Sequence, residues 1–120
     1  MIDTARALYL FWHSFDIPAY TTMTVPDDAE LPYITYSLVE TEPTENASHY
    51  AQVFCRATDN VGLMEKVDAI KEAIGTGKLL RTDSGYVMIR PSTPYVQLMT
   101  DQDPANRYAY INLQLNCYHT

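Results

Sequence analysis

Apolar and polar residues alternate strictly over residues 108–118 of this chain. In a β-strand one face would carry Ala109, Ile111, Leu113, Leu115 and Cys117. The opposite face would carry Tyr108, Tyr110, Asn112, Gln114, Asn116 and Tyr118. Because the side chains of a strand alternate between its two faces, the first set predicts packing on a core and the second an outward surface. The outward set contains no charged residue, and amides and tyrosines cost little to desolvate, so we expect a contact surface there.

Two segments have the apolar spacing of amphipathic helices. The first, residues 3–16, has a stripe formed by Ala5, Leu8, Trp12 and Phe15. The second, residues 61–74, has a stripe formed by Leu63, Val67, Ile70 and Ile74. Expected N-caps are Asp3 or Thr4 for the first helix and Asp59 or Asn60 for the second. We expect the first helix to end before Pro18 and the second at Gly75 or Gly77.

Two strands are predicted in the first half of the chain. Residues 33–40 alternate Ile34, Tyr36 and Leu38 with Thr35, Ser37 and Val39. Residues 49–58 place Ala51, Val53, Cys55 and Ala57 on one face, and Tyr50, Gln52, Phe54 and Arg56 on the other. The two segments are expected to pair antiparallel.

Further strands are predicted after the second helix. Residues 78–81 and 86–90 predict a short hairpin around Asp83-Ser84-Gly85. Pro91 and Pro94 interrupt the pattern, because proline cannot donate a hydrogen bond within a sheet. Residues 95–100 predict another strand, with Val96 and Leu98 facing inward.

Polar stretches connect these elements. Residues 19–32 predict a loop and residues 101–106 a turn. Residues 41–48 form an acidic linker with Glu42 and Glu45, which we expect to protrude as an arm and to contact a partner. The order of elements predicts one domain, residues 1–120, of the α+β class. It would be a mainly antiparallel β-sheet with two α-helices packed on one face.

Composition narrows the function. The chain has 120 residues, is 47% hydrophobic and 19% charged, and carries a net charge of −7. Its eight lysines and arginines are scattered along the sequence, which disfavours nucleic-acid binding as a main function. No run approaches the ~20 apolar residues of a membrane span, and a secretory signal is not expected. We therefore expect a cytosolic product. Its ten tyrosines favour strands and interfaces.

The cysteines and histidines do not form a recognisable reactive pattern. Cys55 and Cys117 fall inside predicted strands without CxxC spacing, which is typical of core residues. His13, His49 and His119 have no partner at the spacing of metal ligands. His13 and Asp16 lie three residues apart on a helix, where a surface pair is a better interpretation than a catalytic dyad.

Two carboxylate pairs and one glycine motif also favour structural interpretations. Asp27 and Asp28, and likewise Asp101 and Asp103, lie in turn regions beside proline, where aspartate bonds the backbone. Residues 75–78, Gly-Thr-Gly-Lys, follow a helix and lack the order of a phosphate-binding loop, so a helix C-cap is expected. We therefore expect no catalytic residue, no cofactor and no metal site.

Several of these features together resemble the tail terminator and related tail-completion, or head–tail joining, proteins of long-tailed bacteriophages. The resemblance rests on the N-terminal amphipathic helix, the strand entry Leu31-Pro32-Tyr33-Ile34-Thr35-Tyr36 and the strand end Phe54-Cys55-Arg56-Ala57. It continues through the helix from Leu63 to Ile74, the Asp-Pro turn and the final strand from Tyr108 to Tyr118.

This resemblance implies a structural virion protein rather than an enzyme. Such proteins have an α+β fold and form rings, usually hexamers, that cap the tail tube and join it to the head. The implied partners are further copies of the chain, the tail tube protein and a head-completion or connector protein. DNA would pass through the lumen without specific binding. The implied location is the tail or neck of the virion, and the host cytoplasm during assembly.

Two other functions remain open at this stage. A head-closure or connector adaptor of the same virion would have a similar sequence pattern. A small enzyme or ligand-binding domain would require His13, His49 or Asp101 to act in a pocket that no sequence motif identifies.

Overall fold

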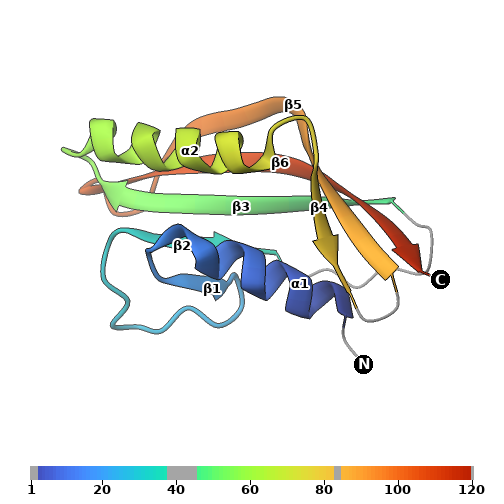
Figure 1. Cartoon of the computed structure of the whole chain (residues 1–120). Helices are drawn as coiled ribbons and strands as arrows, with labels where there is room; N and C mark the ends of the chain where they lie inside the picture. The colour runs from blue at the N-terminus through green and yellow to red at the C-terminus, as the bar shows by residue number, and fades with distance from the viewer. Residues whose placement is uncertain (1–2, 38–45, 83–84, 120) are drawn as a thin grey trace.

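The computed structural model describes residues 3–37, 46–82 and 85–119 (Figure 1). The chain forms two helices, α1 (Asp3–Trp12) and α2 (Asn60–Ile74), a 3-10 turn, η1 (His13–Phe15), directly after α1, and six strands. The strands are β1 (Ala19–Thr21), β2 (Tyr33–Tyr36), β3 (Asn46–Arg56), β4 (Lys78–Arg81), β5 (Gly85–Thr100) and β6 (Asn106–His119).

The six strands form one curled sheet in the order β1-β2-β3-β6-β5-β4. The pair β1/β2 is parallel, whereas β2/β3, β3/β6, β5/β6 and β4/β5 are antiparallel. Strand β6 lies at the centre, between the two other long strands. The α+β class is confirmed, and so are the antiparallel pairing of β2 with β3 and the hairpin of β4 with β5.

Local signals explain where the helices begin and end. The Asp59 carboxylate accepts a hydrogen bond from the Gly62 amide at 3.0 Å and caps α2 as expected. Gly75 ends α2 with φ 58°, a conformation open mainly to glycine. The first helix is shorter than the predicted 3–16, because its last turn tightens into η1. Asp16 then adopts φ 62° two residues before Pro18.

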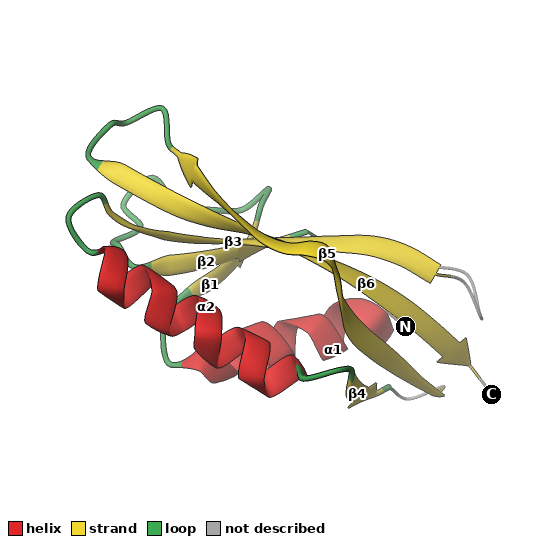
Figure 2. Ribbon diagram, turned by 90° about the horizontal axis from the view of Figure 1, so that it is seen from above, coloured by secondary structure: helices red, strands yellow, loops and turns green. Residues whose placement is uncertain are grey.

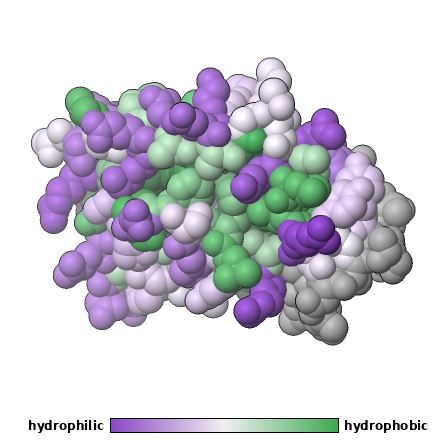
Figure 3. Space-filling view, viewed as in Figure 1, coloured by the Kyte–Doolittle hydropathy of each residue, from purple (hydrophilic) through white to green (hydrophobic). Residues whose placement is uncertain are grey.

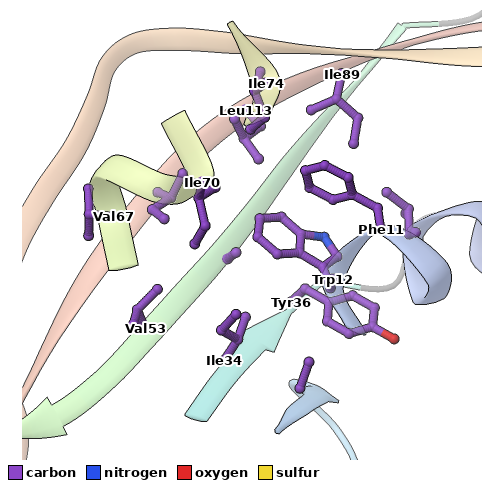
Figure 4. Packing of buried hydrophobic residues seen from close by; sticks show 14 of the residues in the cluster. Phe11, Trp12, Ile34, Tyr36, Val53, Val67, Ile70, Ile74, Ile89 and Leu113 are labelled. Atoms are coloured by element: carbon purple, nitrogen blue, oxygen red, sulfur yellow. The ribbon is translucent and has the colours of Figure 1, made fainter. Parts of the chain in front are cut away.

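One hydrophobic cluster joins both helices to the sheet. The helices contribute Leu8, Phe11 and Trp12, and Leu63, Val67, Ile70 and Ile74. The strands contribute mainly alternate residues, including Ala51, Val53, Val87, Ile89, Ala109, Ile111, Leu113 and Leu115. Trp12 points between Ile70 and Tyr36 and is fully buried (Figure 4). The predicted inward set of β6 is confirmed in full, and both helices lie below β2 and β3 in Figure 2.

The predicted loop 19–32 contains a strand that the sequence pattern missed. Strand β1 has three residues, too few to show a period, and it depends on long-range pairing of Ala19 with Ile34. The chain that follows it, residues 22–32, returns to β2.

Two predictions for β5 were wrong. The strand continues through Pro91 and Pro94 because it shifts register against β6 between Pro91 and Val96. Leu98, predicted to be inward, is 62% exposed. It shares the face of its partner Ala109, but it lies beside Asn60 and Leu63, where the first turn of α2 covers it only in part.

Part of the predicted acidic arm belongs to a strand. Asn46, Ala47 and Ser48 are the first residues of β3 and pair with β6. The remainder of the predicted arm, with Glu42 and Glu45, lies outside the described residues, as do Asp83 and Ser84 of the predicted hairpin turn.

Candidate interaction surface on the sheet

The face of the sheet that points away from the core cluster is the strongest candidate site. It is called the outer face here. On β6 it consists of the predicted outward set, in which Gln114 and Tyr118 are exposed and Tyr108, Tyr110, Asn112 and Asn116 are half-buried. Within the described part of the chain, the buried side chains of both helices pack against the inward residues of the strands (Figure 2). These side chains are therefore partly open to contact.

A row of aromatic rings crosses the outer face from β1 to β6. Tyr20 lies edge-on to Tyr33 at 5.9 Å between ring centroids, Tyr33 stacks on Phe54 at 5.1 Å, and Phe54 meets Tyr108 at 4.9 Å. Register produces the row, because Phe54 pairs with both Tyr33 and Tyr108. Met99 of β5 pairs with Tyr108 and continues the row of side chains onto β5. Each cross-strand aromatic pair contributes about 0.2–1 kcal/mol to the sheet.

Two further aromatic pairs lie along β6. Tyr50 stacks on Tyr110 at 5.3 Å, and Tyr86 lies against Tyr118 at 4.9 Å. Burial, then Tyr50, then Tyr108 raise the pKa of Tyr110, so its hydroxyl remains protonated. Tyr110 therefore presents a neutral hydroxyl group on the outer face at physiological pH.

Asn112 has a structural role within this face. Its Nδ2 donates to the Pro94 carbonyl at 3.1 Å and to Gln97 Oε1 at 3.3 Å. These bonds tie β6 to the irregular part of β5. The result is a polar hollow of about 270 Å³ whose lining includes Tyr50, Thr93 and Pro94. The side-chain amide of Asn112, which the sequence predicted to contact a partner, therefore forms hydrogen bonds within the chain.

Charge is segregated between the sheet and the rest of the chain. Among the described residues, every charged side chain of the six strands is basic: Arg56, Lys78, Arg81, Arg90 and Arg107. The described aspartates and glutamates all lie in helices or connecting segments. Arg56, Arg81 and Arg90 share the outer face through their pairing with Asn106, Tyr86 and Gln114. The basic residues are thus less scattered than the sequence suggested.

The His49 side chain is buried in the core, although the residue also belongs to the lining of the polar hollow. Its side chain is 1% exposed, and Trp12 Nε1 donates to its Nε2 at 2.9 Å. Its Nδ1 lies 2.9 Å from Ser37 Oγ, which also accepts from the Tyr50 amide. Because an indole nitrogen only donates, Nε2 must accept and Nδ1 carries the proton. Burial lowers the pKa of His49 to about 4, so the ring is neutral.

His13, Asp101 and Asp103 each make local contacts. His13 is exposed, its ring lies tilted at 4.0 Å between centroids from the Tyr9 ring, and its Nδ1 donates to the Tyr9 carbonyl at 2.8 Å. Asp101 and Asp103 accept turn hydrogen bonds from the Gln102 and Ala105 amides, as predicted.

The remaining candidates give no reactive cluster. Cys55 and Cys117 are buried thiols of the core, as predicted, and the side chain of His119 is outside the described set. Within the described residues, no group of three or more His, Cys, Asp or Glu side chains could hold a metal ion.

Sequence reasoning found the outward set of β6 but missed the aromatic row. It had placed Tyr50 and Phe54 on the second face of their strand, yet it had no register to align them with Tyr108 and Tyr110. The order β2-β3-β6 supplies that register. Tyr20 was missed because β1 itself was missed.

Comparison with known proteins leaves the chain without an assigned family. No protein-family model matches it, and no curated protein matches it. Neither described helix is long and apolar enough to cross a membrane.

Proposed function

We propose that this chain is a structural ring subunit, a tail terminator that caps a phage tail tube and joins it to the head. The observation that carries the proposal is the outer face, with its aromatic row, amides and absence of strand carboxylates among the described residues. The family resemblance of the sequence supplies the specific role. The mainly antiparallel sheet with its helices on one side leaves a broad surface for this contact.

The chemistry of the outer face suits protein contact. Aromatic rings and arginine are enriched at interface hot spots, because they bury a large area and retain directed polar groups. Gln114 and Tyr118 are exposed and carry an amide and a phenol, so covering them with a partner does not require desolvating a carboxylate. A tail tube protein or a neighbouring subunit is the partner that we assign to this face.

The charge distribution is compatible with a DNA passage. A net charge of −7, with the described acids off the strands, leaves helices and loops as the acidic surface. An acidic lumen repels phosphates and allows DNA to slide without binding. In this arrangement the strands face proteins, and part of the acidic helix and loop surface faces the lumen.

The test is binding to purified tail tubes that lack their cap. The chain is expected to form a closed oligomer by size-exclusion chromatography with light scattering and to bind tube ends in electron micrographs. Binding to emptied heads but not to tube ends would replace the terminator role by a head-closure adaptor. A protein that remains monomeric, with or without tubes, would overturn the ring.

A rival use of the same face is also measurable. Aromatic rings beside arginine can stack single-stranded nucleic acid, as several sheet-based binding domains do. Fluorescence anisotropy with a labelled oligonucleotide separates the two functions. Salt-sensitive, tight binding by the wild-type chain would contradict a purely structural role.

A further inference from the structure

A groove separates helix α1 from the edge strand β4. Leu10, Phe11 and Ser14 line one side, and Leu79 and Leu80 line the other. The groove has a volume of about 410 Å³. Leu10 is 55% exposed and Leu79 is 49% exposed, so two large apolar side chains at the rim of the groove are open to solvent. Figure 3 shows apolar surface gathered where α1 and β4 approach each other, with hydrophilic side chains beside it.

The edge of the groove is basic. Lys78 and Arg81, both exposed, stand at the two ends of β4 and belong to the lining. Isolated exposed leucines are common and need no explanation. Two exposed leucines beside two cationic side chains are more specific. Together they would fit a partner that presents an apolar side chain flanked by carboxylates.

The loop that connects β1 to β2 has this complementary chemistry. Met23 is 86% exposed, the highest value among the exposed large hydrophobic residues of the described chain. Asp27, Asp28 and Glu30 follow it and are exposed. Residues 7–55 contain no lysine or arginine, so no basic residue of that stretch neutralises these acids.

The loop presents Met23 on a fixed turn. The Thr24 amide donates to the Thr21 carbonyl at 3.0 Å, and the two threonine hydroxyls are 2.6 Å apart. The Ala29 amide donates to the Pro26 carbonyl at 3.1 Å. A loop that is already ordered loses less conformational entropy on binding than a flexible loop does.

We propose that the α1–β4 groove receives the β1–β2 loop of a second copy of this chain. Met23 of one copy enters between Leu10 and Leu79 of the next, and the loop acids face Lys78 and Arg81. Because the two surfaces are different parts of the chain, the contact is heterologous and propagates head to tail. This inference rests on the proposed ring and names the contact that would close it.

Cysteine cross-linking tests the contact directly. A Met23→Cys protein mixed with a Leu79→Cys protein is expected to give a disulfide-linked dimer, several-fold above either protein alone. The native Cys55 and Cys117 are each 1% exposed and should not interfere. Val61→Cys is the matched control, since Val61 is 72% exposed on α2. Equal cross-linking to Cys at 61 and 79, or none to 79, would overturn the groove assignment.

Charge reversal provides a second and independent test. Asp27→Lys with Asp28→Lys, or Lys78→Glu with Arg81→Glu, should each weaken self-association by about ten-fold. Mixing the two reversed proteins should recover association, because the charges match again. Glu65→Lys with Glu72→Lys on the exposed side of α2 is the control and should have little effect.

The outcomes distinguish this inference from the ring on which it rests. If the wild-type chain forms rings that neither reversal weakens, the groove contact is wrong and the ring stands. If the wild-type chain never self-associates, the ring itself is overturned. Capture of a different acidic partner in the groove, with rings intact after reversal, would assign the groove to that partner instead.

Discussion

The Trp12 indole donates a hydrogen bond to His49 Nε2 at 2.9 Å inside the core. The two residues come from α1 and β3, thirty-seven positions apart in sequence. The bond fixes the histidine tautomer, and Ser37 completes it from the other side. A chain of buried hydrogen bonds thus fastens the N-terminal helix to the sheet.

The first prediction concerns pH. The pKa of His49 is about 4 in the folded chain and about 6.5 when unfolded, so the unfolded state binds more protons between these values. Stability from this group is complete above pH 6.5 and is lost as the pH falls toward 4. The full loss is on the order of 3 kcal/mol. Urea unfolding at pH 7, 6 and 5 should show the decline.

A neutral replacement at His49 provides the control for this pH effect. His49→Gln cannot gain a proton, so its free energy of unfolding should change less over the same range, despite a lower value at pH 7. Parallel curves for the two proteins would mean that other groups, such as carboxylates, cause the decline.

The second prediction concerns the indole. Trp12→Phe removes the N–H that bonds His49 and leaves a cavity beside Ile70 and Tyr36. The lost volume and the unpaired ring nitrogen together should cost about 2–4 kcal/mol of unfolding free energy. Tyr9→Phe on the same helix, at a side chain 50% exposed, should cost under about 0.5 kcal/mol. If the two variants lost the same unfolding free energy, the buried Trp12–His49 hydrogen bond and the packing around it would not contribute specially to stability.

The sequence predicted most of the local structure and little of what depends on register. The helix stripes, the Asp59 and Gly75 caps and the inward face of β6 follow from periods that a few residues display. Strand β1 and the continuation of β5 through its prolines depend on pairing with distant strands, which no local pattern encodes. Leu98 is a similar case. Alternation correctly predicted which face of the sheet it lies on, but how far α2 extends over that face decides how much of its side chain is buried.

The candidate site divides in the same way. The outward residues of β6 were named from alternation alone. The aromatic row needed the alignment of β2, β3 and β6, and the α1–β4 groove needed the curl of the sheet. The sequence pattern predicted His49 only as the first residue of a strand. Its position two residues before Ala51 also puts its side chain on the inward face of that strand.

The third prediction concerns Gly75. Its φ of 58° and ψ of −133° lie in a region almost closed to residues with a side chain. A Cβ there would meet nothing within 4 Å, so the cost of Gly75→Ala is backbone strain alone, roughly 1–3 kcal/mol. Gly75→Asn should be no better, since asparagine tolerates φ above zero only with a different ψ. Thermal unfolding measures both, and a Gly75→Ala protein as stable as wild type would contradict the assigned cap.

The last prediction concerns the outer face itself. Gln114 is exposed on β6 and pairs with Ser48 and Arg90, so Gln114→Lys places two cations side by side at the centre of the proposed contact. The monomer should lose less than about 1 kcal/mol, whereas partner binding should weaken roughly 100-fold, because a buried unpaired charge is costly. Ala69→Lys adds the same charge on the exposed side of α2 and serves as the control. Titration of each protein against tail tubes, with circular dichroism to check folding, gives both quantities. If Gln114→Lys binds as tightly as Ala69→Lys, the outer face is not the contact surface, whatever the state of the groove.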